Sequence, residues 1–419
     1  MALRQEMTSG AKEEQVRPLT ATVDLDERRI AVVAYTEYPS DSRVRREAEF
    51  LAEDGRVVHV IALRSRHDRS LTDFAGVRLH ELPLSARRGS KLRYLYQYSL
   101  FFVLSLVQLI RLHRKGRFDL VHVHSLPDFQ VFCALPLRLS GCAVLLDLHE
   151  GFPEILAARF PKSSILVRVA AGLEQLSCRF ANHVLAANDG IRAAVISRGL
   201  SAQRITSIFN SGDPPNEFPS AETIRRRFDL PGGKLIIHAG GVNPERDLET
   251  VVRAFAQLTD ELDVHLIVAG EGESQYLNSL KAMVADLGLS DRVRFLGRLD
   301  WEQAYSLMSL SSVGLVTLAT NPLTQIAWPT RIVEYANLEK PLVVPEFRSI
   351  RAILGEGAQY YKPGDPNSLA KALRSNLLTT DTHQLAITRA ASVCRRFASR
   401  HMREILRGVV TKLEDSRAA

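Results

Sequence analysis

The chain has 419 residues, more than one hydrophobic core usually supports, so two domains are expected. Its hydrophobic content of 46%, with 24% charged residues, excludes an intrinsically disordered protein. The formal net charge of +7 favours an anionic partner, namely nucleic acid, a phosphorylated ligand or an anionic membrane surface, without choosing among them.

Residues 1–28 mix charged residues with Ser, Thr and Gly and lack the apolar centre of a signal peptide, so we expect a disordered leader. From residue 29 onward, short runs of Val, Ile and Leu alternate with segments of helical period. This alternation is typical of parallel strands joined by crossover helices. In the first unit, expected over residues 29–214, the strands are predicted at residues 30–35, 57–63, 77–82, 120–124, 143–148, 183–186 and 205–209.

One segment of this unit, Lys91–Lys115, is apolar and aromatic in its centre and basic at its ends. Polar residues such as Gln97 and Ser105 interrupt its apolar run, which falls short of the ~20 residues that a spanning helix needs. Two interpretations stay open. The segment is either a buried crossover helix or a helix in peripheral contact with an anionic membrane surface.

Residues 210–233 break the periodicity with Pro, Gly and Asn, which indicates an interdomain hinge. A second unit is expected over residues 215–382, with strands at 235–239, 264–269, 293–296, 314–318, 342–344 and 358–361. Residues 383–419 have no partner strand and are predicted to pack as helices back across the domain boundary. The predicted fold class is therefore α/β, with two doubly wound Rossmann-like domains facing a cleft.

The four cysteines form neither a CxxC pair nor a disulfide framework, which favours a reducing, cytoplasmic compartment.

An anion site is predicted where the strand at residues 235–239 runs into Gly240 and Gly241. Glycines let backbone amides approach a pyrophosphate, and a helix start favours negative charge. Arg246 adds a full positive charge beside this turn.

A second feature of the same kind is the segment PTRIVE. Thr330 suits a helix start, and Arg331 and Glu334, three residues apart, share one face of the first turn. An arginine can hold a phosphate with two hydrogen bonds, and a carboxylate can accept both hydroxyls of a ribose. The alternative is a surface ion pair.

In the first unit, the segment DLHEGFPE follows an apolar strand and places His149 just past the strand end, with Glu150 and Glu154 beyond it. A neutral imidazole there is suited to hydrogen-bond a sugar hydroxyl or a transferring oxygen. Zinc binding by His122, His124 and His149 is a weaker alternative, because no supporting cysteine or carboxylate spacing accompanies them.

The loop TEYPSDSRVRRE, with Tyr38 and Arg43, follows the first strand and leads into a basic helix. We predict that Tyr38, Arg43, Glu150 and Glu154 form the acceptor side of the cleft. The alternative for the arginines of this helix is a solvated surface.

With these motifs together, the chain resembles family 4 of the retaining glycosyltransferases, which have the GT-B fold and need no metal. The likeness covers residues 29–377 and rests on the order and spacing of YTEYPSDSRVRREAEFLAEDG, FDLVHVHSLPDF, DLHEGFPE, VLAANDGIRA, IFNSGD, GGVNPERDLETVVRAF, LIVAGEGE, DRVRFLGRL, PTRIVEYANLEKPLVV and YYKPGDP.

The resemblance implies roles for matching positions. His149 would hydrogen-bond the donor sugar, Arg246 and Arg331 would hold the diphosphate, and Glu334 the ribose. The backbone of Gly297, Arg298 and Leu299 would meet the base.

Some positions depart from the family pattern. Ile326 stands where many members carry a Glu that touches the donor sugar, which leaves the donor open. Gly241 stands where an Arg is often found, Arg246 and Arg331 replace Lys, and Asp247 and Glu339 replace Gly.

The expected partners are a nucleoside-diphosphate sugar and an acceptor hydroxyl on a polysaccharide, glycolipid or small natural product. No nucleic acid, metal or other cofactor is expected. The alternatives are a sugar-nucleotide epimerase or phosphorylase on the same fold, and a non-catalytic protein that binds a nucleotide sugar.

Overall fold

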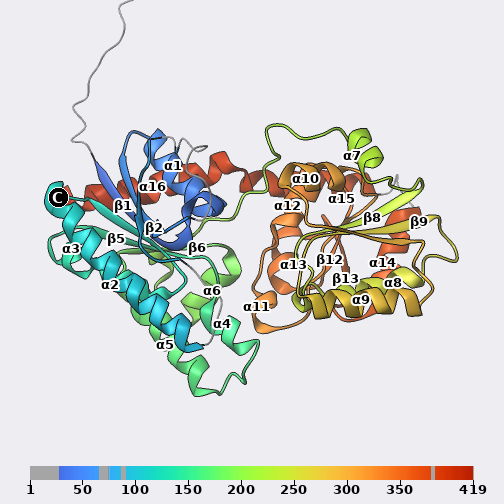
Figure 1. Ribbon diagram of the computed structural model, residues 1–419, viewed down its shortest axis with the longest axis horizontal. Helices are drawn as coiled ribbons and strands as arrows, with labels where there is room; N and C mark the ends of the chain where they lie inside the picture. Colours follow the sequence, from blue (N-terminus) through green and yellow to red (C-terminus); the bar gives the residue numbers. More distant parts are fainter. Residues whose placement is uncertain (1–27, 66–73, 75, 86–90, 379–382, 419) are drawn as a thin grey trace, which may run out of the picture.

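The computed structural model describes residues 28–65, 74, 76–85, 91–378 and 383–418 (Figure 1). Apart from Arg28, the predicted leader lies outside the described residues. Within these ranges the chain forms two α/β units built on parallel sheets, which confirms the predicted fold class.

The first unit contains, in the described part of the chain, a parallel sheet with the order β3-β2-β1-β4-β5-β6-β7. Its central strands are buried on both faces, which explains their continuous aliphatic runs. The strands are β1 (Arg29–Glu37), β2 (Val57–Leu63), β3 (Arg78–Leu82), β4 (Leu120–His124), β5 (Ala143–Leu148), β6 (His183–Ala186) and β7 (Ile205–Ser207).

Helices cover both faces of this sheet. One face carries α2 (Lys91–Lys115), η3 (Asp128–Ala134), α3 (Leu135–Leu139), α5 (Ile165–Phe180) and α6 (Asp189–Ser197), whose buried side chains share one apolar cluster. The opposite face carries α1 (Ser42–Glu53) and the last helix, α16 (Ser399–Ala418). Short elements lie between them: η1 (Tyr38–Ser40), α4 (Phe152–Ala157) and η4 (Ala202–Arg204).

The second unit is built on the strands β8 (Lys234–Ala239), β9 (Val264–Ala269), β10 (Val293–Gly297), β11 (Gly314–Leu315), β12 (Leu342–Pro345) and β13 (Gln359–Tyr361). A bridge between Ile236 and Val313 joins the β10-β9-β8 and β11-β12-β13 ladders. The strand predicted at 314–318 ends at Leu315 in the structure, and beyond Val316 the chain bonds to groups other than the backbone of a neighbouring strand. Thr317 Oγ1 donates to the Arg246 carbonyl at 2.6 Å, and the Leu318 amide donates to Tyr361 Oη at 3.3 Å.

The helices of the second unit also form two layers. One contains α8 (Leu248–Ala256), α9 (Ser274–Asp286) and α14 (Pro366–Leu378), and the other α10 (Trp301–Ser309), α12 (Thr330–Asn337), α13 (Arg348–Leu354) and α15 (Gln384–Cys394). The connecting elements are α7 (Ala221–Arg227), η5 (Pro244–Arg246), α11 (Pro322–Gln325) and η7 (Arg395–Phe397).

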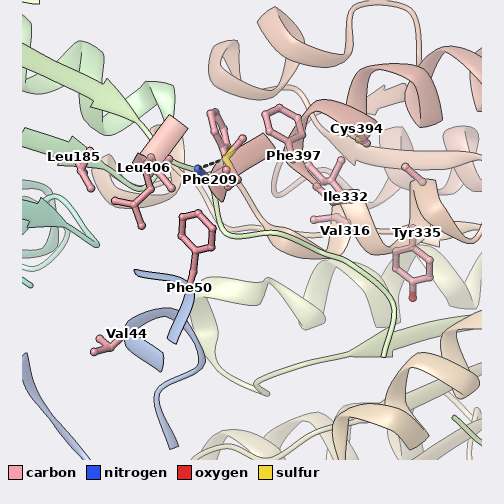
Figure 2. Packing of buried hydrophobic residues seen from close by; sticks show 14 of the residues in the cluster. Val44, Phe50, Leu185, Phe209, Val316, Ile332, Tyr335, Cys394, Phe397 and Leu406 are labelled. Atoms are coloured by element: carbon pink, nitrogen blue, oxygen red, sulfur yellow. Dashed lines mark hydrogen bonds between the residues drawn. The ribbon is translucent and has the colours of Figure 1, made fainter. Parts of the chain in front are cut away.

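Three aromatic rings meet where the chain passes between the units. Phe209 lies 4.4 Å from Phe397 and 6.1 Å from Trp328, and Trp328 lies 5.2 Å from Phe397, measured between ring centroids. Figure 2 shows Phe209 and Phe397 in this junction, with the Phe209 amide bonded to the Met402 sulfur at 3.2 Å. The rings come from the first unit, the second unit and the C-terminal segment, so this cluster holds all three together.

The C-terminal segment crosses between the units. The helix α15 packs on α12 and α13 of the second unit, whereas α16 lies along the first unit (Figure 1). The buried Glu414 of α16 accepts hydrogen bonds from Arg56 at 3.0 Å and from Arg28 at 2.7 Å. The chain therefore passes between the units twice, once after β7 and once at η7. The exact boundary at residues 214 and 215 stays a prediction.

Candidate functional site

The first cavity of interest, called the β8 cavity, lies at the carboxyl ends of β8 and β11 and has a volume of about 220 Å³. Every residue that lines it belongs to the second unit: His238, Ala239, Gly240, Gly241, Arg246, Leu315, Val316, Thr317, Pro329, Thr330, Arg331 and Tyr335. The glycines follow β8, and Gly240 has a φ of 153°, a value that L side chains rarely adopt. The structure thus brings Gly240, Gly241 and Arg246 together with Thr330 and Arg331, which come more than 80 residues later in the sequence.

The β8 cavity is strongly positive. Burial lowers the pKa of Arg246, and the neighbouring Arg331 lowers it further. Burial likewise lowers the pKa of His238 to about 4, although a bond to the Gly241 carbonyl opposes this, so the imidazole is neutral at pH 7. Arg331 has one compensating partner, Glu334, at 2.5 Å. Two guanidinium groups at one small cavity favour a ligand with more than one negative charge.

A second cavity of about 410 Å³, called the interdomain cavity, adjoins the first and shares Arg246 with it. It is lined from both units: His149, Glu150, Ala187, Asn188, Ile191 and Asn210 from the first, and Asn243, Glu245, Arg246, Leu318, Leu323, Thr324, Ile326, Ala327 and Trp328 from the second. Arg246 therefore stands between the β8 cavity and a space that faces His149.

A buried polar network holds the His149 ring. His149 Nε2 lies 2.9 Å from His124 Nδ1 and 3.3 Å from Asp147 Oδ2. Asp147 also accepts two hydrogen bonds from Arg43, at 2.6 and 2.9 Å. Burial alone would raise the pKa of Asp147, but Arg43 and the two histidines hold it well below its usual range. Asp147 is therefore an anion that orients the histidine, while the exposed part of the His149 ring faces the interdomain cavity.

Four residues of this network, Glu47, His122, His124 and Asp147, offer ligand atoms within 4.8 Å of one another. The guanidinium group of Arg43 already lies between the two carboxylates, 3.3 Å from Glu47 and 2.6 Å from Asp147. A divalent cation would have to displace that charge, so the residues do not fit a metal site well. The predicted zinc alternative, which included His149, gains no support from this arrangement.

For two residues, Tyr38 and Arg43, the prediction of a contact with the acceptor is wrong. Tyr38 is fully buried and packs edge-on against Phe74, 5.2 Å between centroids. Arg43 is buried as well, because it pairs with Asp147. Neither side chain is accessible to an acceptor, and these two predictions are corrected. Glu154 is engaged by Arg198 at 2.7 Å and lies outside the lining of the interdomain cavity, whereas Glu150 contributes to that lining.

The remaining predicted donor residues, Glu334 and residues 297–299, are not among the residues that line the β8 cavity. Glu334 is buried behind Arg331 on α12. Gly297 ends β10, where its carbonyl accepts a bond from the Gly270 amide at 2.7 Å, and Arg298 and Leu299 follow. Their assignment to the ribose and the base stays a prediction.

Sequence reasoning missed several polar residues that line the two cavities, among them His238, Asn188 and Asn243. His238 is the penultimate residue of β8, and its polar character within an aliphatic run was the available signal. Asn188 caps α6 by accepting a bond from the Ile191 amide at 2.9 Å, and it lies at the interdomain cavity because it follows β6. The rule that binding residues follow parallel strands would have found it.

The helix α2 combines features of both interpretations of Lys91–Lys115. Phe101, Leu109 and Leu112 are buried against the sheet, as expected for a crossover helix, while Val103 and Val107 are exposed. By length and composition alone, α2 is the one helix among the described residues that would be able to cross a membrane. Its packing on the sheet opposes a spanning role, because removal would uncover that core.

Two protein-family models match the chain, each over one unit. The glycosyl transferase 4-like domain matches residues 40–211, and the glycosyl transferases group 1 model matches residues 220–392.

Curated relatives cover part of the chain. The 2-deoxystreptamine glucosyltransferase of Streptomyces kanamyceticus is 28% identical over 235 residues, covering 51% of this chain and 57% of the relative. The alpha-D-kanosaminyltransferase of the same organism is 23% identical over 233 residues, covering 52% and 57%. The chain thus spans little more than half the length of these two relatives.

Solved structures match nearly all of the fold. HepE from Anabaena in complex with UDP has a TM-score of 0.70 at 18% identity, covering 92% of this chain and 100% of HepE. Sucrose-phosphate synthase from Thermosynechococcus elongatus has a TM-score of 0.75 at 17% identity, covering 93% and 100%. The two family models, which match one unit each, show that the chain belongs to the group 1 glycosyl transferases. The likenesses to the solved structures show its fold, the GT-B arrangement of two Rossmann-like domains.

Proposed function

We propose that this chain transfers a sugar from a nucleoside-diphosphate sugar to an acceptor hydroxyl. The observation that carries the proposal is the doubly cationic β8 cavity, which adjoins the interdomain cavity through the shared Arg246. A diphosphate fits the first space by charge, and a sugar attached to it would extend into the second. The names of the curated relatives, both sugar transferases, and the UDP bound by HepE point the same way.

The mechanism follows from where charge develops. As the bond between the anomeric carbon and the diphosphate oxygen breaks, negative charge grows on the leaving group. Arg246, Arg331 and the amides at the start of α12 are placed to stabilise it, which is usually the largest contribution to such catalysis. In this proposal the new bond forms between the anomeric carbon and the acceptor oxygen on the face that the diphosphate leaves. The acceptor proton passes to the departing phosphate oxygen, and the configuration is retained.

Within this proposal no metal or other cofactor takes part, because the two arginines supply the positive charge that a metal ion would otherwise bring. His149, held by Asp147 and His124, hydrogen-bonds the donor sugar in the interdomain cavity. Glu334 and the backbone of residues 297–299 bind the ribose and the base. Of the four residues predicted for the acceptor side, Glu150 is the one that lines the interdomain cavity, and we assign the acceptor contact to it.

The proposal also places the protein in the cytoplasm, where the nucleotide sugar would be available. All four cysteines are free and buried, as suits a reducing compartment. Peripheral contact of α2 with a membrane belongs to the same proposal. The acceptor is a polysaccharide, a glycolipid or a small natural product.

The test begins with a thermal-shift screen of UDP, GDP, ADP and TDP. A nucleotide present at about 100 times its Kd stabilises the folded state by about 2.7 kcal/mol, a shift that is easily measured. Arg246→Ala should abolish the shift. Arg253→Ala, which removes an exposed arginine from α8 in the same unit, is the matched control and should preserve it. Failure of every nucleotide to stabilise the protein would contradict the proposal.

The matching nucleotide sugars then separate the reaction classes. Conversion of the sugar without an acceptor would indicate an epimerase, and dependence on inorganic phosphate would indicate a phosphorylase. Tight binding without turnover for any acceptor in a panel of polysaccharides, glycolipids and aminocyclitols would favour a non-catalytic binding protein.

A further inference from the structure

Among the described residues, exposed large apolar side chains are concentrated on the outer side of the helix layer formed by α2, α3 and α5. Of the seventeen large apolar side chains that are exposed in the described part of the chain, twelve belong to these three helices. Scattered single residues of this kind are ordinary, but such a concentration marks an interaction surface. The three helices lie on one side of the first sheet (Figure 1).

On α2 the exposed residues form a continuous stripe. Leu92, Tyr96, Val103 and Val107 follow one another at helical spacing, and Arg111 continues the line toward the basic end. The opposite side of the helix is held in the core by Phe101, Leu109 and Leu112. The helix therefore lies flat on the sheet with an apolar outer side along several turns.

The helix α5 repeats this pattern. Ile165, Val169 and Leu176 are exposed in one line, with Gly172 between them and Arg179 at the end. Both helices pack on η3, where Phe102 of α2 contacts Phe129 and Phe180 of α5 contacts Phe132. Because α2 and α5 belong to one layer over the same side of the sheet, their outer sides form one surface. Leu135 and Leu139 of α3 add to it.

The charge of this surface selects its partner. The helix α2 has five Lys or Arg residues, α3 has one and α5 has two, against a single carboxylate, Glu174. Glu174 is buried and bonded to Arg198 at 2.7 Å, so it contributes nothing to the surface. Arg159 and Lys162, just before α5, are exposed and add two more positive charges. A second copy of the chain would bring like charges together across a symmetric interface, which disfavours self-association.

From these observations we infer that α2, α3 and α5 form one docking face for an anionic lipid bilayer. Aliphatic side chains and tyrosines enter the boundary between headgroups and acyl chains, while the surrounding arginines and lysines bind acidic headgroups. The inference goes beyond contact through α2 alone, and it does not depend on the proposed transfer reaction.

The face has a definite orientation relative to the cleft. The helix α5 begins next to α4, and α4 contacts α11 of the second unit, so Ile165 and Leu166 lie at the cleft end of the face. The N-terminal end of α2 follows β3 and lies at the same edge of the sheet, because α2 runs from there back to the start of β4. Docking therefore brings the mouth of the cleft close to the bilayer surface.

Site-directed labelling tests the extent of the face. All four native cysteines are buried, so an environment-sensitive fluorophore can be attached to one introduced exposed cysteine. The positions are Leu95→Cys on α2, Leu166→Cys and Leu176→Cys on α5, and Leu385→Cys on α15 as an equally exposed control. With phosphatidylcholine vesicles containing phosphatidylglycerol, the first three labels should shift to shorter wavelength and the control should not. A shift on α2 alone would overturn the three-helix face.

Cosedimentation measures the energetics with unlabelled protein. The wild type should bind the phosphatidylglycerol vesicles, bind pure phosphatidylcholine vesicles at least about 10-fold less, and lose affinity as salt rises. The pair Val107→Glu and Val169→Glu should each lower binding about 10-fold or more, whereas Leu385→Glu should not. The inference fails if both vesicle types bind equally, if neither binds, or if the wild type is a dimer that Val107→Glu and Val169→Glu dissociate.

Discussion

The backbone carbonyl of Ile326 in the second unit lies directly against Gly190 in the first. A Cβ atom at Gly190 would come within 2.2 Å of that carbonyl oxygen, and one at Gly151 would come within 3.1 Å of the Ile326 side chain. Ile326 occupies the position where the resemblance drawn from the sequence leads us to expect a glutamate. Here it forms part of the contact that closes the interdomain cavity.

Gly190→Ala should therefore hold the two units apart. The β8 cavity is built from the second unit alone, so nucleoside diphosphate affinity should change less than about threefold, while transfer should fall about 10²-fold because the reacting groups are misaligned. Nucleotide titration, turnover and small-angle scattering check this, with a larger radius of gyration expected. Gly408→Ala on α16, where an added Cβ meets nothing within 4 Å, is the matched control. Wild-type turnover in Gly190→Ala would show that the contact is dispensable.

Substitution of Glu334 should mainly weaken donor binding, whereas substitution of Arg331 should mainly slow the transfer step. Glu334→Gln keeps the size of the side chain and removes the charge that strengthens hydrogen bonds to ribose hydroxyls, so donor binding should weaken by about 1.5–3 kcal/mol. Arg331→Ala should lower the single-turnover rate about 10²-fold or more, beyond its effect on binding. Donor dissociation constants and single-turnover rates distinguish the two. If both variants had wild-type dissociation constants and single-turnover rates, the 2.5 Å contact between Arg331 and Glu334 would be only a structural ion pair.

The stability of the protein should depend on pH through His238. Burial lowers its pKa from 6.5 to about 4, so below pH 6.5 the unfolded chain binds a proton that the folded chain does not. Stability from this residue is complete above pH 6.5 and is lost as pH falls toward 4, by about 2–3 kcal/mol. Urea unfolding of the wild type and His238→Gln at pH 7.5 and pH 4.5 measures the difference. An equal loss in both proteins would exclude His238 as the cause.

Glu339 occupies a backbone conformation that favours glycine. Its φ is 52°, and it follows α12 in a turn where the Lys340 amide donates to the Tyr335 carbonyl at 3.0 Å. Glu339→Gly should raise the free energy of unfolding by about 0.5–1 kcal/mol, because a Cβ is disfavoured there. Glu339→Ala should give no such gain. Chemical denaturation compares the three proteins, and the prediction is wrong if glycine is no better than alanine.

The sequence was sufficient to predict where the strands lie, because most of them are short aliphatic runs bounded by polar turns, as in β5 and β9, although β7 and β11 are shorter than predicted. It also predicted that Gly240, Arg246 and Arg331 converge, since they belong to segments that follow strands of one parallel sheet on the side of the cleft. The two positions where this chain departs from the glycine of the family pattern were informative as well. Asp247, like Glu339, has a φ of 52°, and at both positions the resemblance drawn from the sequence leads us to expect glycine.

The sequence was insufficient where a side chain's role depends on a distant partner. Arg43 lies in a segment whose composition is that of an exposed basic helix. Its side chain is nevertheless buried, because it pairs with Asp147, 104 residues later in the chain. Tyr38 is polar at one atom only, and its ring is buried beside Phe74. The exposed apolar sides of α2 and α5 form one surface only after the chain has folded. The periodicity of each helix in the sequence therefore predicts its own apolar side, but not that the two sides lie next to each other.

The position of α16 has a consequence for synthesis on the ribosome. Leu406, Val410 and Leu413 of this last helix cover one side of the sheet that the earliest strands build. Helix α1 covers part of that side early, but the part that α16 covers stays exposed until the entire second unit has been translated, so the nascent first unit presents apolar surface to its surroundings during that period. Truncation within α16 is therefore expected to damage the unit most distant in sequence, and chaperone dependence should lie with the first half of the chain.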